Sequence, residues 1–327
     1  MSDAIKNFPK QFEFEPVIVK GEKLGRYEGF IVAGMGGSHW AADLLKIWNP
    51  ASDITIHSDY GFPAYIKSER TSQMLFIASS YSGNTEETLD SLEHAREKGM
   101  AVAAITVGGK LLEIAKKDSL PYVQIPDTGI QPRSALGFSM IGLLALMGKT
   151  ETIQKLHSLS DTLDAGGLEK EGKALADRLN GYIPLIYSSA TNKAIAYNWK
   201  IKCNETGKIP AFCNVFPELN HNEMNGFDVT PATKTLSEKF YYILLKDAGD
   251  HPQVQKRMEV LDGLYRDRRI RGESIELKGA AIFEKIFSSL ILADWASFYT
   301  AENYGLESEQ VPMVEEFKIT LRNTNTP

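Results

Sequence analysis

The stretch IASSYSGNTEET, residues 77–88, is typical of a buried strand that runs through a polar turn into a helix. The apolar run 74–78 precedes the turn, and a helix-forming segment, 88–98, follows it. Three hydroxyl groups fall on the turn, those of Ser80, Ser82 and Thr85. Gly83 allows the backbone to fold tightly there. Because free N–H groups at a helix N-terminus favour anions, the pattern indicates a site for phosphate, particularly a dianionic monoester.

Helix capping is the alternative explanation for these polar residues. Asn84 and Glu87 have the spacing of a capping box, and Ser82 is also a suitable cap residue. Spacing alone does not separate capping from anion binding. The turn carries more hydroxyl groups than one cap requires, which slightly favours binding.

A glycine-rich turn occurs upstream, where GMGGS (residues 34–38) follows a predicted strand at 29–33 and precedes a predicted helix at about 41–48. Strand, glycine turn and helix form the unit that binds phosphates or dinucleotides. Asp59, just after a second strand at 54–57, also fits a dinucleotide fingerprint. However, His39 occupies the position of the third glycine, where close helix–strand packing excludes a side chain. A NAD site is therefore disfavoured.

The remaining pattern alternates strands with helices, which predicts an α/β fold with parallel sheets covered by helices on both faces. Further strands are expected at 101–107 and 122–125, and a helix at 134–146 closes the first half. The polar, helix-like stretch 151–180 follows, so we predict domains at 1–152 and 153–327. The second half contains strands and helices in a similar order, at 182–187, about 190–202, 241–245, 274–277, 280–303 and 311–321.

Composition narrows the class of protein. The chain has 327 residues, enough for two α/β domains, and a net charge of -6, which argues against general nucleic-acid binding. No apolar run approaches the ~20 residues that cross a membrane, and the N-terminus lacks the apolar core of a signal peptide. Two cysteines, Cys203 and Cys213, fit a reducing compartment and no zinc site. We expect a cytoplasmic protein without metal or cofactor.

Three further stretches combine polar residues that carry chemistry. They are QPRS (131–134), NETGK (204–208) and PELNHNE (217–223). Taken singly, Arg133 would be a surface arginine, Glu205 a solvated carboxylate near two lysines, and His221 a surface or structural histidine.

Together these motifs resemble a known family. The loop from Ser80 to Glu87 resembles the phosphosugar-binding loop of sugar isomerase (SIS) domains, which are flavodoxin-like. The combination with GMGGS, QPRS, NETGK, PELNHNE and the segment EEFK (315–318) resembles the bifunctional phosphoglucose/phosphomannose isomerases over nearly the whole chain. The resemblance implies two SIS domains and interconversion of glucose 6-phosphate, and possibly mannose 6-phosphate, with fructose 6-phosphate.

The resemblance also implies roles for individual residues. Glu205 matches the base that moves a proton between C1 and C2, and His221 matches a ring-opening residue that the partner subunit of a homodimer supplies. Arg133 matches the group that stabilises the enediolate, and Lys318 matches an active-site lysine. The positions that match substrate and phosphate contacts are Gly36, Gly37, Ser38, Ser80, Ser82 and Thr85.

Two positions depart from the family pattern, and two other functions remain open. His39 follows GMGGS, where the family usually has glycine. Val311 precedes Pro312, where the family often has a threonine that is associated with accepting either configuration at C2 of the sugar. Mannose 6-phosphate is therefore less expected than glucose 6-phosphate. A noncatalytic SIS sensor would keep the serine loop without needing Glu205 and His221. A glucosamine-phosphate synthase would need an N-terminal glutaminase cysteine, which the residues Met1-Ser2-Asp3 do not provide.

Overall fold

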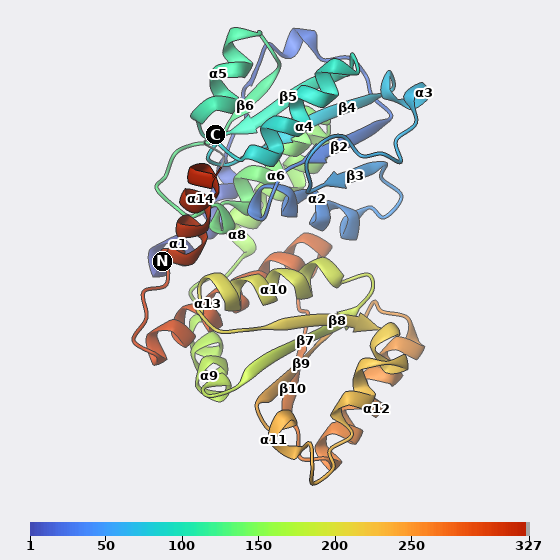
Figure 1. Cartoon of the computed structure of the whole chain (residues 1–327), viewed down its shortest axis with the longest axis vertical. Helices are drawn as coiled ribbons and strands as arrows, with labels where there is room; N and C mark the ends of the chain where they lie inside the picture. Colours follow the sequence, from blue (N-terminus) through green and yellow to red (C-terminus); the bar gives the residue numbers. More distant parts are fainter. Residues whose placement is uncertain (325–327) are drawn as a thin grey trace. The chain divides into compact units, whose positions relative to one another are not determined.

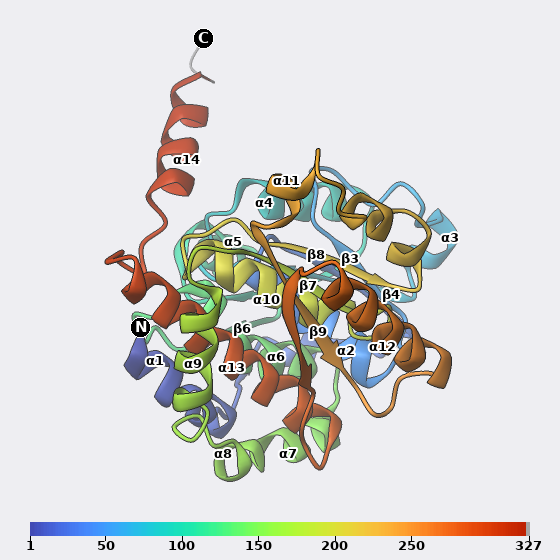
Figure 2. The ribbon, with the colours of Figure 1, turned by 90° about the horizontal axis from the view of Figure 1, so that it is seen from below.

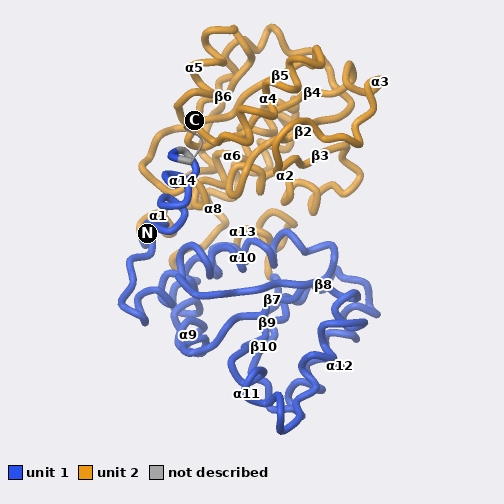
Figure 3. The backbone as a smooth tube through the Cα atoms, viewed as in Figure 1, with its two compact units in different colours: residues 1–2, 167–277, 289–327 blue, residues 3–166, 278–288 orange. Residues whose placement is uncertain are grey.

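The computed structural model describes residues 1–324, apart from the side chains of 322 and 324, and it forms two compact units (Figure 3). The N-terminal unit, orange in Figure 3, contains residues 3–166 and 278–288. The C-terminal unit, blue, contains residues 1–2, 167–277 and 289–327. Each unit is a group of residues that contact one another more than they contact the other group. The units differ in extent from the domains predicted from the sequence, 1–152 and 153–327, and those domains stay a prediction.

The sheet of the N-terminal unit has the strand order β1-β6-β5-β4-β2-β3. Its strands are β1 (Ile18–Val19), β2 (Gly29–Ala33), β3 (Ile54–His57), β4 (Met74–Ser79), β5 (Ala101–Thr106) and β6 (Tyr122–Gln124). The pairs are parallel except for β1 with β6. The order from β3 to β6 is that of a flavodoxin-like sheet, in which ligands bind where the winding reverses, between β2 and β4.

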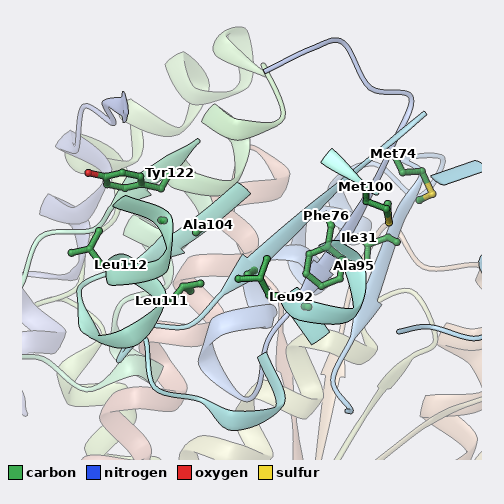
Figure 4. Close-up of a cluster of buried hydrophobic side chains, with 13 residues drawn as sticks. Ile31, Met74, Phe76, Leu92, Ala95, Met100, Ala104, Leu111, Leu112 and Tyr122 are labelled. Atoms are coloured by element: carbon green, nitrogen blue, oxygen red, sulfur yellow. The ribbon is translucent and has the colours of Figure 1, made fainter. Parts of the chain in front are cut away.

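Helices cover both faces of this sheet. The longer ones are α2 (Gly37–Trp48), α4 (Glu86–Glu97), α5 (Gly109–Lys117) and α6 (Leu136–Leu146). On one face, strand residues such as Phe76 pack against Leu92 of α4 and Leu111 of α5 (Figure 4). On the other face, Gly142 of α6 approaches Val123 of β6 closely. The shorter helical elements are α1 (Ser2–Lys6), η1 (Phe8–Glu13), η2 (Gly21–Lys23), α3 (Ser68–Thr71), η3 (Pro132–Ser134), α7 (Thr150–His157) and α8 (Leu159–Thr162).

The sheet of the C-terminal unit has the order β10-β9-β7-β8, with parallel pairs throughout. Its strands are β7 (Ile183–Ser189), β8 (Phe212–Phe216), β9 (Phe240–Lys246) and β10 (Arg271–Glu276). Figure 1 shows α10 (Lys193–Glu205) and α12 (Pro252–Asp267) on opposite sides of this sheet. The other elements are α9 (Glu169–Leu179), η4 (Glu218–His221), η5 (Glu223–Phe227), α11 (Lys234–Ser237) and α14 (Pro312–Thr324). Helix α13 (Ile282–Asn303) begins in the N-terminal unit and continues in the C-terminal unit from residue 289.

The α/β class, the parallel sheets and the covering of both sheet faces are confirmed. The start of the first long helix was predicted wrongly at Ala41, because α2 already begins at Gly37, within the glycine turn. Several elements had not been predicted, among them α5, β8 and α12. Strand β8 lies at an edge of its sheet and is only half buried, so its apolar signal is weak. Helix α12 begins after His251, whose side chain accepts a hydrogen bond from the Gln253 N–H.

Candidate functional site

The serine loop follows β4 and is held in shape by its own hydroxyl groups. Ser80 is fully buried, and its Oγ lies 2.8 Å from Thr85 Oγ1 and accepts a hydrogen bond from the Gly83 N–H at 3.1 Å. Gly83 has φ +69°, and an added Cβ would fall 1.7 Å from the carbonyl oxygen of Gly108. Only glycine fits there without a shift of the backbone. Ser82, by contrast, is exposed at the surface of the loop.

The structure does not support a capping box at α4. The N-cap residue is Thr85, and it makes no side-chain capping bond. The Asn84 side chain turns into the loop instead, where its amide donates to Ser82 O at 3.1 Å and its oxygen accepts from the Lys110 N–H at 3.2 Å. The Ser82 Oγ accepts from the Asn84 N–H, which lies before the helix. The alternative explanation, that Asn84 or Ser82 caps α4, is therefore wrong.

The absence of a cap leaves donors at the start of α4. In the part of the chain that the structure describes, no backbone or capping acceptor is found for the N–H groups of Glu86, Glu87 and Thr88. The first intrahelical bond at this end runs from the Leu89 N–H to Thr85 O. Unpaired N–H groups at a helix N-terminus attract an anion, so this turn is suited to bind a phosphate group.

The glycine turn after β2 is tied to the serine loop. Ser38 Oγ accepts a hydrogen bond from the Tyr81 N–H at 3.0 Å, and Ser79 Oγ donates to Ser38 O at 2.6 Å. Because β2 and β4 are neighbours, both loops emerge from adjacent carboxyl ends of the sheet. The structure thus brings Gly36, Gly37 and Ser38 beside the loop of Ser80, Ser82 and Thr85, at the point where the winding of the sheet reverses.

Arg133 belongs to the same unit and lies near this turn through its backbone. It sits in η3 and is only 2% exposed. A Cβ on Gly37 would lie 2.9 Å from Pro132 O and 3.1 Å from the Arg133 nitrogen, so the two segments are in close contact. Gln11 fixes η3 from the other side, since its amide donates to Ser134 O at 2.6 Å.

Glu205 is the last residue of α10 and is half buried. The end of this helix is held by a buried ion pair between Lys202 Nζ and Asp294 Oδ1 of α13 at 2.5 Å. The turn that follows is closed by Lys208, whose Nζ donates to Glu205 O at 2.6 Å and also to Gln310 O. The carboxylate of Glu205 is therefore carried on a firmly anchored helix end.

His221 ends η4 and is exposed. The residues that hold its segment had not been predicted from the sequence. Glu223 accepts hydrogen bonds from Tyr187 of β7 and from Asn214 of β8. The available signal was the polar Asn214 inside an otherwise apolar strand.

Lys318 lies on α14, where Nζ contacts Glu315 Oε1 at 2.7 Å and both side chains are exposed. Figure 2 shows α14 extending away from the sheet of its own unit. The predicted site residues thus divide between the units: the phosphate contacts and Arg133 belong to the N-terminal unit, and Glu205, His221 and Lys318 to the C-terminal unit.

The equivalent edge of the C-terminal sheet carries carboxyl groups, where the N-terminal sheet has N–H and hydroxyl donors. The loops after β7 and β9 bring together Asn192, Asp247 and Asp250, all buried, and Asn192 Nδ2 lies 3.3 Å from Asp247 Oδ2 and 3.2 Å from Asp250 Oδ1. Two carboxyl groups here disfavour a phosphate dianion. Among the described residues, this edge is therefore less suited to an anion than the turn after β4.

Within residues 1–324, no helix is both long enough and apolar enough to cross a membrane. Among the same residues, no cluster of three or more His, Cys, Asp or Glu side chains has an arrangement that could hold a metal ion.

Comparisons with known proteins agree with this arrangement. A model of the bacterial phospho-glucose isomerase C-terminal SIS domain matches residues 168–321. Among solved structures, a tagatose-6-phosphate ketose/aldose isomerase from Escherichia coli superimposes with a TM-score of 0.68 at 17% identity, over 94% of this chain and 93% of that one. That likeness shows the fold alone.

Two curated relatives align over almost the full length. The bifunctional phosphoglucose/phosphomannose isomerase of Aquifex aeolicus is 32% identical over 324 residues, which cover 97% of each chain. The protein of the same name from Caldicellulosiruptor bescii is 35% identical over 339 aligned positions, which cover 97% of this chain and 98% of the relative. The chain therefore belongs to the bifunctional phosphoglucose/phosphomannose isomerase family.

Proposed function

We propose that this protein is an aldose–ketose isomerase that interconverts glucose 6-phosphate and fructose 6-phosphate. The observation that carries the proposal is the serine loop, where the uncapped start of α4 and the hydroxyls of Ser82 and Thr85 offer donors to a phosphate. The phosphate does not react, so its binding energy serves to orient the sugar. The contacts proposed for it come from Gly36, Gly37, Ser38, Ser80, Ser82 and Thr85.

The reaction requires two kinds of proton transfer. His221 opens the sugar ring by moving protons between the ring oxygen and the anomeric hydroxyl, a task for which imidazole is suited near neutral pH. Glu205 then removes the hydrogen on C2 as a proton and returns it to C1 through a cis-enediol, while the O2 hydroxyl loses its proton and O1 gains one. A positioned general base typically contributes about 10²- to 10⁴-fold.

Charge that develops on the oxygens of the enediolate needs a cation. Arg133 has a guanidinium that can stabilise the oxyanion selectively in the transition state. Lys318 is the second cation that we assign to the reaction. The reaction itself needs neither a metal nor a cofactor, and we propose none.

We further propose that the enzyme works as a homodimer in the cytoplasm and that His221 of the partner subunit acts on the sugar held by each chain. The exposure of His221 and of its segment fits a residue that meets a second subunit. A cross-subunit residue would make activity depend on the dimer.

The relatives favour catalysis over the alternative of a noncatalytic sensor, because those that align over nearly the full length are named isomerases. Their names also include phosphomannose isomerase. Val311 stands where a threonine would be expected, so we propose that glucose 6-phosphate is the better substrate.

One set of coupled assays tests the proposal. Purified protein is given glucose 6-phosphate, mannose 6-phosphate or fructose 6-phosphate, and product formation is followed enzymatically. We expect turnover of glucose 6-phosphate and fructose 6-phosphate, with slower turnover of mannose 6-phosphate. Binding of these sugars without turnover of any of them would identify a sensor instead.

A further inference from the structure

The segment that carries His221 packs against the core of its unit through Leu219, Met224 and Phe227, and polar contacts hold its other side. It consists of η4 and η5, and among residues 218–227 Leu219 is the buried residue. Short 3₁₀ turns have poor hydrogen-bond geometry, so they depend on side-chain anchors. Two polar anchors hold this segment: Asn220 Oδ1 accepts from Arg257, and Glu223, two residues after His221, accepts from two strands.

Both carboxylate oxygens of Glu223 are engaged by neighbouring strands. The hydroxyl of Tyr187, in β7, donates to Oε1 at 2.5 Å, and the amide of Asn214, in β8, donates to Oε2 at 2.5 Å. Tyr187 is fully buried. Burial raises the pKa of Tyr187, and the nearby Glu223 carboxylate raises it further, so the phenol keeps its proton and acts as a donor.

Asn222, the residue after His221, makes two further hydrogen bonds. Asn222 Nδ2 donates to Glu218 Oε1 at 2.8 Å, and Asn222 Oδ1 accepts from the Glu223 N–H at 2.6 Å. Asn222 therefore joins the side chain of Glu218, before His221, to the backbone of Glu223, after it. Because Glu223 is two residues from His221, a shift of its anchored carboxylate would move the segment that carries the imidazole.

We infer that Glu223 is a positioning residue for ring opening: it fixes the His221 segment to β7 and β8 through Tyr187 and Asn214. This inference rests on the ring-opening role proposed above for His221. Hydrogen bonds to an ionised group are stronger than neutral ones, which suits a carboxylate to this role. A displacement of about 1 Å at a reacting group can cost 10²-fold in rate.

The test exchanges the donor and acceptor within the Glu223–Asn214 contact. In Glu223→Gln the side chain has one acceptor oxygen in place of two, so it can no longer accept from both Tyr187 and Asn214, and the charge that strengthened both bonds is gone. In the double variant Glu223→Gln/Asn214→Asp, the Gln amide donates to the new carboxylate while its oxygen still accepts from Tyr187. The Asp oxygen also keeps the bond from the Val215 N–H.

Tyr242→Phe is the matched control. Tyr242 is likewise buried in the sheet and donates to a carboxylate, that of Asp262, at 2.7 Å. Asp262 belongs to α12, so this bond does not hold the His221 segment.

Two readouts are compared, the α–β anomer interconversion of glucose 6-phosphate by NMR exchange and the amide exchange of residues 217–227 by mass spectrometry. We expect Glu223→Gln to slow anomer interconversion roughly 10- to 100-fold with little change in KM. It should also speed amide exchange in the segment, and the double variant should restore both. Glu205→Gln should lose isomerisation while keeping anomer interconversion, since ring opening precedes the base step.

Several outcomes overturn the inference. They are anomer interconversion within twofold of wild type in Glu223→Gln, failure of the double variant to restore it, or an equal loss in Tyr242→Phe. The inference also fails if wild-type protein does not speed anomer interconversion, because His221 would then not open the sugar ring. Failure of the proposed function is distinguishable, because it appears as wild-type protein without isomerisation, whatever the amide exchange shows.

Discussion

The hydroxyl oxygens of Ser80 and Thr85 lie 2.8 Å apart, so a hydrogen bond joins the two ends of the turn after β4. Ser80 is fully buried, and its hydroxyl also receives the Gly83 N–H, so Ser80 shapes the loop. Ser82 is exposed, and its Oγ accepts from the Asn84 N–H, which leaves its own O–H to donate to a ligand. The hydroxyls of the loop therefore have different tasks.

Replacing Ser82 by alanine should weaken phosphosugar binding without destabilising the protein. Loss of a hydrogen bond to a charged group costs about 1.5–3 kcal/mol, roughly ten- to a hundredfold in affinity. Thermal unfolding with and without glucose 6-phosphate measures this as a smaller ligand-dependent rise in Tm.

The control for Ser82 is Ser91→Ala, in the middle of α4, where the hydroxyl donates to Asp59 O. This variant should keep the full ligand-dependent rise. If Ser82→Ala lowers the unliganded Tm and keeps that rise, the loop acts as a structural turn and the phosphate assignment fails.

Gly83→Ala should be strongly destabilising. The residue combines φ +69° with an added Cβ only 1.7 Å from Gly108 O, so the backbone must move. We expect a loss of more than about 1 kcal/mol in the free energy of unfolding, from urea denaturation. Gly148→Ala separates the cost of a positive φ from the cost of the close contact, because φ is +67° at Gly148 but an added Cβ would meet nothing within 4 Å. Equal losses in both variants would show that the close approach to Gly108 contributes nothing.

Glu205→Gln should keep the fold and phosphate binding but lower isomerisation by roughly 10²-fold or more. The amide preserves the shape of the side chain and removes its ability to take a proton. Steady-state kinetics, together with the ligand-dependent rise in Tm, measure both properties. Turnover near that of wild type would remove Glu205 from the mechanism.

Isomerase activity should survive exhaustive chelation, because the proposed steps use only side chains of the protein. The assay compares protein dialysed against a strong chelator with untreated protein. Activity that disappears and returns only with added Zn²⁺ would point to a different class of isomerase.

Alkaline pH should destabilise the C-terminal unit. Burial, with help from the Glu273 carboxylate that accepts its hydrogen bond, raises the pKa of Tyr241 to about 12. The folded-state pKa of Tyr241 lies above its unfolded value of about 10. The contribution of Tyr241 to the free energy of unfolding is therefore fully present below pH 10 and is lost as pH rises toward 12. Urea midpoints measured across this range should fall, and less steeply in Tyr241→Phe. Identical slopes would show that Tyr241 does not titrate in this way.

Most of the strand pattern could be predicted from the sequence because apolar runs between turns are local signals. The bounds of β2 and β3 agree with the predicted strands, and β4 and β5 differ by one residue. Helix α12 also carries a local signal, since Met258, Leu261 and Tyr265 recur at helical spacing and are buried. This helix could therefore have been predicted from its period. Strand β8 is different, because its half-buried edge position leaves no clean alternation to detect.

The sequence by itself determined the α/β class and the family, and it singled out the residues expected to perform the chemistry, because motifs and hydrophobic periods are local properties of the chain. Tertiary structure decided the partner of each polar group. Asn84 could cap α4 or bind the loop, and the approach of Lys110 from the next βα turn selected the loop. Glu223 gained its role only when β7 and β8 brought Tyr187 and Asn214 to its carboxylate. Hydrogen bonds form over about 3 Å between residues far apart in the chain, so their pairing follows from the packed fold and not from spacing in the sequence.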